Sequence, residues 1–272
     1  MDELIIVVAP YPGEKQPERF EGKMNVPEEI IRSYNEGACI GHLHVRDENG
    51  FQVADPTVFK RTIDTVHASC PIIIEGSTGG TPEHTLEQRS AAFRVPGVEM
   101  GSLNMGSINM AGSVYQNPMS EIRYYARELK NHKIKPFPCI FDLSMLYNVR
   151  RLEEEGLLSQ PFAYNFVFDS PDCLPFSTKA LDLYLELIPK GSSWILTRYH
   201  GKAGEDARIA MERGGHVRVG YEDGPFLSSG KRARSNAEIV KEVAETARAL
   251  GRKVVGPDRA RQLLGLAANP KF

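Results

Sequence analysis

Several features that mark particular classes of protein are scarce or missing in this sequence. Four of the 272 residues are cysteines and none forms a Cys-x-x-Cys pair, so neither a disulfide framework nor a thiolate zinc site is indicated. The 33 lysines and arginines nearly balance the 35 aspartates and glutamates, which leaves no basic footprint for nucleic acid. Hydrophobic stretches are too short to span a bilayer, and Met1-Asp2-Glu3 lacks the basic start of a secretory signal. We therefore expect a cytoplasmic protein whose partners are small molecules, with no role for nucleic acid or membrane.

Two nucleotide-binding motifs are also missing. No Gly-x-Gly-x-x-Gly follows the first predicted strand, and no Walker sequence is present, which disfavours a doubly wound open sheet. What the chain does contain is a regular alternation of β-rich and helical stretches, and eight such units in about 250 residues predict a TIM (β/α)8 barrel. No low-complexity linker interrupts the pattern. We expect residues 1–272 to form a single TIM-barrel domain with a short C-terminal helical extension.

The alternation gives definite boundaries for the expected elements. The predicted strands cover 4–9, 39–45, 71–75, 98–103, 135–141, 162–168, 193–197 and 216–220. The predicted helices cover 27–36, 56–68, 82–94, 117–131, 144–155, 177–187, 205–213 and 236–250, with a terminal helix at 258–264. Capping residues support several of these starts, such as Asp55 before Pro56 and Ser235 before Asn236.

Two histidines of the second predicted strand are expected on one face. Side chains alternate between faces along an extended chain, so His42 and His44 point one way while Leu43 and Val45 point the other. Two imidazoles directed at one point indicate a metal site. A carboxylate is a common third ligand in catalytic zinc centres, with one position left open.

Glu222 is the preferred third ligand. It follows the last strand, which closes the barrel against the first, so Glu222 ends two strands from His42 at the same mouth. Asp47 is the alternative, but its neighbour Arg46 supplies a charge partner, and we expect Asp47 to support the loop instead. Taken alone, residues 222–225 also fit a plain acidic turn.

Other polar side chains also collect where the predicted strands end. In a TIM barrel these positions meet at one mouth, where active sites of the fold lie. With the three candidate ligands they form the set Glu14, His42, His44, Ser77, Ser102, Asn104, Asp142, Arg218, Glu222 and Asp223. Within an apolar strand, Arg218 needs a carboxylate partner, which Asp223 or Asp142 could supply.

Small polar residues add to this set. Ser102 and Asn104 share a face of a strand that would otherwise be apolar, and a ligand is one candidate partner for them. The glycine-rich turn 76–80 could either close a tight βα connection or bind an anion through its backbone N–H groups. In the second case, Ser77 could donate to a substrate carboxylate.

Most of these polar residues fall in four short motifs. The motifs are His-Leu-His-Val-Arg-Asp (42–47), Ser-Thr-Gly-Gly (77–80), Ser-Leu-Asn-x-Gly (102–106) and Gly-Gly-His-Val-Arg-Val-Gly-Tyr-Glu-Asp (214–223). In this order and spacing, and with Ser-Asn-Ala-Glu-Ile-Val (235–240), the chain resembles the β-keto acid cleavage enzyme family. The resemblance implies a TIM barrel that converts a β-keto acid and acetyl-CoA, as co-substrate, into acetoacetate and a new acyl-CoA.

The resemblance also implies roles for individual residues. Zn²⁺ or another divalent metal would be held by the positions matching His42, His44 and Glu222. Asp223 would be the base and Arg218 would orient the acidic group. Substrate contacts would come from Ser77, Gly80, Ser102 and, at the distal amino group, Glu14. Members of the family are typically homo-oligomers, often tetramers.

The chain departs from the family pattern in places, and two other functions stay open. Ser102 stands where a threonine is usual, Gly224 replaces a frequent asparagine, and segment 137–142 keeps only Asp142 where glutamates are common, which leaves the substrate undetermined. One alternative is an amidohydrolase-like metal hydrolase, for which His200 and His216 would have to supply further ligands. The other is a barrel that binds a metal or an acyl ligand without turnover.

Overall fold

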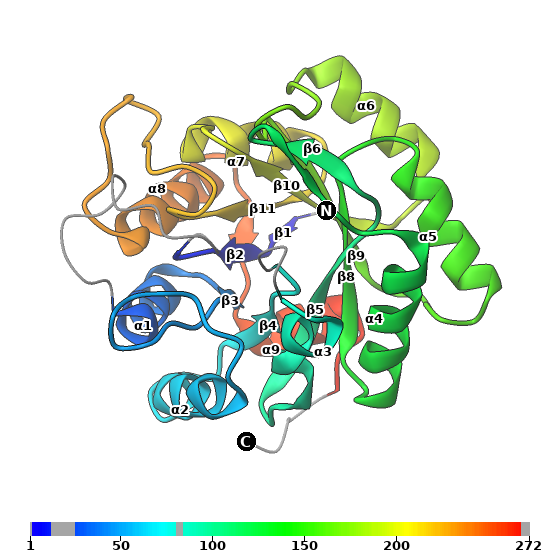
Figure 1. The fold of residues 1–272 in the computed structure, drawn as a ribbon. Helices are drawn as coiled ribbons and strands as arrows, with labels where there is room; N and C mark the ends of the chain where they lie inside the picture. The colour runs from blue at the N-terminus through cyan, green and yellow to red at the C-terminus, as the bar shows by residue number, and fades with distance from the viewer. Residues whose placement is uncertain (1, 12–24, 80–83, 268–272) are drawn as a thin grey trace.

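The computed structural model describes residues 2–11, 25–79 and 84–267 of the chain. Eight parallel strands close into a barrel in the order β10-β11-β2-β3-β4-β5-β8-β9. They are β2 (Ile6–Val8), β3 (Ile40–Leu43), β4 (Ile73–Gly76), β5 (Val98–Asn104), β8 (Lys135–Ile140), β9 (Ala163–Phe168), β10 (Ser193–Arg198) and β11 (His216–Val219). Helices surround this ring (Figure 1), and the predicted TIM barrel is confirmed.

The helices begin close to the residues that the capping signals indicated. They are α1 (Val26–Glu36), α2 (Pro56–His67), α3 (Leu86–Arg89), the 3₁₀-helix η2 (Ala91–Arg94), α4 (Met119–Asn131), α5 (Met145–Glu154), α6 (Thr178–Leu187), α7 (Ala203–Glu212), α8 (Asn236–Ala249) and α9 (Pro257–Leu264). Asp55 caps α2 by accepting from the N–H of Thr57, and Ser235 caps α8 by accepting from the N–H of Glu238. Among the described residues, no helix combines the length and the apolar character that crossing a membrane requires.

Three parts of the fold differ from the prediction. The strand expected at 4–9 is split, because β1 (Glu3–Leu4) pairs with β12 (Lys253–Val254) outside the barrel. The helix expected at 82–94 is broken into α3 and η2, and its first two residues lie outside the described residues. An unpredicted hairpin joins β6 (Ile108–Met110) to β7 (Ser113–Tyr115), and its turn residues Ala111 and Gly112 both have positive φ.

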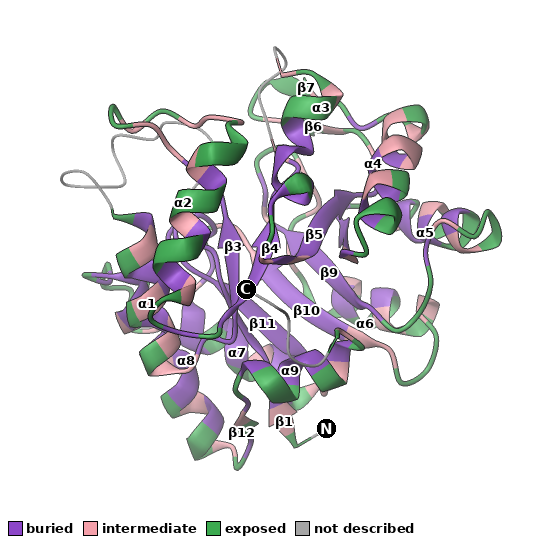
Figure 2. Ribbon diagram, turned by 90° about the horizontal axis from the view of Figure 1, so that it is seen from below, coloured by how far each residue is buried: buried purple, intermediate pink, exposed green. Residues whose placement is uncertain are grey.

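The barrel interior is filled by a core of its own. Its side chains come from the barrel strands, from residues next to them and from α9, and they include Ile5, Val7, Cys39, Ile40, Ile73, Met100, Phe137, Ala163, Ile195, Ala260 and Leu264. Figure 2 shows the barrel strands largely buried, whereas exposed residues lie mainly on the outer faces of the helices and in the loops. Because apolar side chains fill the interior toward α9, the buried polar residues that follow the barrel strands lie at the opposite, C-terminal mouth.

Candidate functional site

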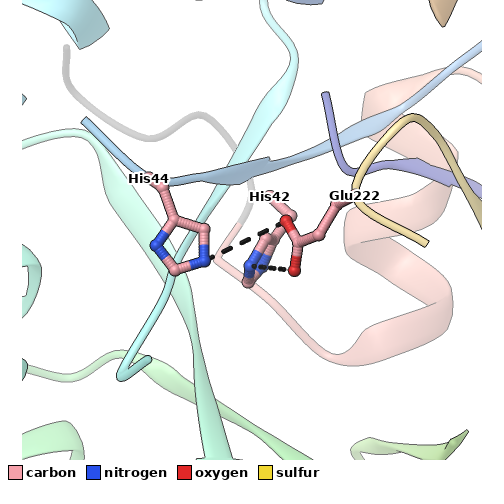
Figure 3. A group of neighbouring side chains, drawn as sticks. All are labelled: His42, His44 and Glu222. Atoms are coloured by element: carbon pink, nitrogen blue, oxygen red, sulfur yellow. Dashed lines mark ion pairs between the residues drawn. The ribbon is translucent and has the colours of Figure 1, made fainter. Parts of the chain in front are cut away.

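Three buried side chains at the mouth face one another. His42 lies on β3, His44 lies two residues further along the chain, and Glu222 follows β11. The Nε2 atom of His42 lies 3.5 Å from Oε1 of Glu222, and Nε2 of His44 lies 4.0 Å from Oε2. Figure 3 shows the two rings and the carboxylate directed toward one another, with one ligand atom from each residue within 4.8 Å of the others. The proximity expected from the sequence is therefore present.

The protonation states of His44 and Glu222 suit a metal ion. Burial lowers the pKa of His44 to about 3, so its imidazole is neutral and keeps a lone pair to donate. Burial would raise the pKa of Glu222, but Arg218 and the two histidines outweigh burial and lower it to about 2. Neutral imidazole and ionised carboxylate are ligands that divalent zinc accepts. These three residues therefore fit a divalent metal.

Glu75 is a functional residue that the sequence reasoning missed. It is the penultimate residue of β4, with 0% of its surface exposed, and the β3–β4 register places it directly beside His42. Its Oε2 atom contacts Nδ1 of His42, which leaves Nε2 of that ring directed toward Glu222. Burial lowers the pKa of His42, but Glu75 and Glu222 outweigh this and raise it above its ordinary value. A carboxylate ending the apolar run 72–74 was the signal that could have revealed it.

A tight turn at residues 220–224 presents Glu222 to the histidines. The backbone N–H groups of Asp223 and Gly224 both donate to the carbonyl of Gly220, at 3.1 and 2.8 Å. The N–H of Glu222 donates to the carbonyl of Ala9, at 3.2 Å, which ties the turn to the end of β2. Gly220 has a φ of +142°, and a Cβ there would lie 2.2 Å from the Ala9 oxygen, so only glycine fits.

Arg218 is buried beside this turn and binds both of its carboxylates. Its Nε and Nη2 atoms donate to Oδ2 and Oδ1 of Asp223, each at 2.9 Å, and Nη2 also donates to Glu222, at 2.5 Å. Burial raises the pKa of Asp223, an effect that the Arg218 charge opposes. Two carboxylates were expected as possible partners of Arg218. The pairing with Asp223 is confirmed, and the alternative pairing with Asp142 is wrong. Asp142 is exposed and accepts from the N–H of Ser144, because it begins the loop before α5.

The small polar residues hold the turn after β4. Ser77 accepts from the N–H of Gly79 at 2.9 Å, and a Cβ on Gly79 would lie 3.0 Å from the His44 ring, so this turn packs against His44. Ser102 accepts from the N–H of Thr78 at 2.8 Å, and Asn104 donates to the Tyr115 hydroxyl at 3.0 Å. Ser77 thus lies beside His44, and Ser102 holds the next residue of the same turn. The partner of Asn104 belongs to the hairpin that the sequence did not predict.

The remaining predicted residues lie elsewhere. Glu14 and Gly80 are outside the described residues. Asp47 accepts from the N–H groups of Asn49 and Phe51, both at 2.9 Å, and so closes its own loop as a support. The guanidinium of its neighbour Arg46 stacks 3.6 Å over the ring of Tyr11 and donates to the carbonyl of Gly50.

The two histidines that a hydrolase of the amidohydrolase type would need do not join the site. Within residues 2–11, 25–79 and 84–267, the one group of side chains placed to hold a metal is His42, His44 and Glu222. His216 begins β11, and its Nδ1 atom accepts from the N–H of Ile5 at 3.1 Å. His200 follows β10, and its backbone N–H donates to the backbone carbonyl of Asp223 at 2.6 Å. Neither ring is part of the candidate metal centre.

Comparisons with known proteins agree on one family. The profile described as beta-keto acid cleavage enzyme matches residues 4–266. A 3-keto-5-aminohexanoate cleavage enzyme from Fusobacterium nucleatum is 34% identical, over 98% of this chain and 99% of its own. A 3-oxoadipate:acetyl-CoA acetyltransferase from Cupriavidus necator is 31% identical, over 86% of this chain and 83% of its own.

A solved structure shares the fold. ObcA, in a ternary complex with a C4-CoA adduct and oxalate, superimposes with a TM-score of 0.74 at 18% identity. The superposition covers 89% of this chain and 66% of ObcA. At that identity, the likeness supports the barrel architecture alone.

Proposed function

Because the chain belongs to the β-keto acid cleavage enzyme family, and is an acetyl-CoA-dependent acyltransferase of that type, we propose that a divalent metal, zinc, completes its site at His42, His44 and Glu222. The reaction is the exchange of a β-keto acid and acetyl-CoA for acetoacetate and a new acyl-CoA. The observation that carries the proposal is the contact of the buried Arg218–Asp223 pair with the metal-binding carboxylate of Glu222.

When bound, the divalent cation supplies a Lewis acid that stabilises negative charge on substrate oxygens. Asp223 then removes a proton from the carbon between the ketone and the carboxylate of the β-keto acid. Its raised pKa makes it a stronger base than an ordinary carboxylate. Two hydrogen bonds from Arg218 hold the Asp223 carboxylate in place. Ser77 and Ser102 are proposed to contact the substrate's acidic end.

The carbanion formed by Asp223 attacks the thioester carbonyl of acetyl-CoA. A carbon–carbon bond forms, the carbon–sulfur bond breaks, and the CoA thiolate leaves. The thiolate then attacks the original ketone carbon of the substrate, and the bond from that carbon to the former carbanion breaks. One product is the new acyl-CoA, and the other carries the electron pair as the carbanion of acetoacetate. Asp223 returns the proton to it, so the enzyme ends as it began.

The tail of the β-keto acid decides which acyl-CoA is made. The relatives' names cover both kinds of charge, since 3-keto-5-aminohexanoate has an amino group and 3-oxoadipate a second carboxylate. We propose a cationic tail, in line with the role that the family resemblance implies for Glu14. Asn104 is proposed as a further substrate contact.

The experiment that tests the reaction uses apoprotein prepared with a chelator and reloaded with zinc. Acetoacetate and acyl-CoA are measured by mass spectrometry after incubation with acetyl-CoA and β-keto acids with cationic, neutral and anionic tails. We expect product with the cationic member and none in the apoprotein. No product with any member while zinc is bound would refute the exchange reaction, and hydrolysis of an amide without CoA would point to the hydrolase.

The metal ligands are tested separately. His42→Ala should lose stoichiometric zinc and turnover together, because two ligands do not retain the ion at the affinity of three. His132→Ala is the matched control, since His132 is exposed after α4 and should leave both quantities unchanged. Zinc retained at one equivalent by His42→Ala would refute the ligand assignment.

Three further expectations stay predictions. They are a single domain over residues 1–272, a homo-oligomer that is often a tetramer in this family, and a cytoplasmic location. Light scattering of the purified protein measures the second of these directly.

A further inference from the structure

Asn236, the first residue of α8, is completely buried and has a partner for every polar atom of its side chain. It lies in the motif 235–240, to which the proposed reaction assigns no task. Its Oδ1 atom accepts from the backbone N–H of Tyr221 at 2.9 Å, and its Nδ2 atom donates to the Pro10 carbonyl at 3.3 Å. Nδ2 also donates to Oε2 of Glu29 at 2.9 Å, as does the backbone N–H of Asn236.

Glu29 contributes to the orientation of the Asn236 amide, together with Tyr221 and Pro10. The Tyr221 N–H needs an acceptor, whereas the Pro10 carbonyl and an ionised carboxylate only accept, so the amide oxygen faces Tyr221 and the NH₂ group faces Glu29. Glu29 belongs to α1, whose helix packs beside α8, and it is 9% exposed. The contact joins the two helices that flank β2, both visible in Figure 1. One of the contacts that orient this side chain thus comes from a second helix.

The bond to Tyr221 acts on the residue just before the two acidic groups of the site. Tyr221 precedes Glu222 in the 220–224 turn, and its hydroxyl donates to the carbonyl of Ala233 at 2.6 Å. The turn is therefore held at consecutive backbone N–H groups, by Asn236 at Tyr221 and by the Ala9 carbonyl at Glu222. Without the amide, the Tyr221 N–H would lose its hydrogen bond to Oδ1, which favours movement of the turn.

We propose that Asn236, oriented by Glu29, is a positioning residue that sets where Glu222 and Asp223 stand relative to the two histidines. The inference rests on the proposed function, because it assigns Glu222 to the metal and Asp223 to the proton. Misplacement of about 1 Å can cost on the order of 100-fold in rate. A ligand held by a weakened support typically costs about 10- to 100-fold in metal affinity.

The test changes each of the two partners. Asn236→Asp keeps an oxygen for Tyr221 but places a second carboxylate against Glu29. We expect Asn236→Asp to weaken zinc binding about 10- to 100-fold, to lower kcat about 100-fold with a smaller change in KM, and to alter the absorption spectrum of the cobalt-loaded protein. Glu29→Ala removes the acceptor of both Asn236 donors and should shift the same three quantities in the same direction. Glu29→Gln keeps an acceptor oxygen for these donors and should recover most of each loss.

Ser235→Ala is the matched control. Ser235 caps the same helix by accepting from the backbone N–H of Glu238 at 3.2 Å, a bond at the start of α8 that does not involve the 220–224 turn. Its loss should lower the melting temperature and leave zinc affinity, kcat and the cobalt spectrum unchanged. If Asn236→Asp fails to fold, Asn236→Ser, which removes the amide without adding charge, should show the same losses of zinc affinity and kcat.

The outcomes separate the inference from the proposed function. Folded Asn236 variants with wild-type zinc affinity, kcat and cobalt spectrum would refute the positioning role while the reaction stands. Losses in Asn236→Asp that Glu29→Ala does not share would also refute the pairing with Glu29. A wild-type protein that binds no metal would instead refute the proposed function, and this inference with it.

Discussion

Arg218 donates two hydrogen bonds of equal length to Asp223, from Nε and Nη2 to the two carboxylate oxygens, each at 2.9 Å. The same Nη2 atom also donates to Glu222, so one guanidinium serves both acidic residues of the 220–224 turn. A planar fork of donors is needed for this arrangement, and the ammonium of lysine cannot reproduce it. The proposed base and the proposed metal ligand therefore depend on one cation.

Arg218→Lys should lower both stability and turnover. The lysine keeps the charge but cannot form the paired bonds to Asp223 and the bond to Glu222 together, and we expect a loss of about 2 kcal/mol in the free energy of unfolding. Urea unfolding of the metal-free protein measures this. Arg234→Lys is the control, because Arg234 pairs with Glu238 at an exposed position and should change stability by less than about 0.5 kcal/mol. Equal changes in the free energy of unfolding for the two substitutions would contradict a stabilising role for the paired hydrogen bonds of Arg218.

Asp223→Asn should keep the metal and lose turnover. The amide has nearly the shape of the carboxylate but cannot accept the substrate proton, so kcat should fall about 10²- to 10⁴-fold. Zinc content and kcat are measured on the same preparation. Asp47→Asn provides the comparison, because an amide oxygen can still accept from Asn49 and Phe51, and its activity should match that of wild type. Substantial turnover in Asp223→Asn would exclude Asp223 as the base.

Glu75→Gln should weaken metal binding without removing a ligand. The neutral amide no longer stabilises positive charge on the His42 ring, so the pKa of His42 should fall in the metal-free protein. The less basic imidazole should bind zinc about 10- to 100-fold more weakly. Chelator competition measures the affinity, and proton NMR titration measures the pKa. An unchanged zinc affinity would show that Glu75 contributes only to packing.

His216 should make the protein less stable in acid. Burial lowers its pKa from the ordinary value of 6.5 to about 3, so the folded state keeps the ring neutral while the unfolded state binds a proton below about pH 6.5. Stability is therefore lost as pH falls from about 6.5 to about 3. His216→Asn retains an acceptor for the Ile5 N–H and cannot titrate, so its unfolding free energy should depend less steeply on pH in that window. Identical slopes for the two proteins in urea unfolding would contradict this prediction.

Local patterns in the sequence were enough for the barrel and for part of the site. The alternation of strands and helices predicted eight βα units, and the closed ring confirms them. The two-residue period of a strand placed His42 and His44 on one face, because that period is a property of the extended backbone itself. Arg218 and Asp223 are five residues apart, and the need of a buried guanidinium for a carboxylate predicted Asp223 as one of two candidate partners, with Asp142 as the other.

The remaining features depend on contacts between distant segments, which local patterns do not encode. Glu75 stands beside His42 only because of the register between β3 and β4, which is set by how the whole barrel closes. The break of the first strand reflects the pairing of β1 with β12, almost the full chain length away. The sequence by itself thus determined the barrel, the histidine pair and the acidic turn. Only the tertiary structure decided that Glu75 orients one histidine and that Asn236 holds the turn, because both depend on strand register and helix packing between residues far apart in the chain.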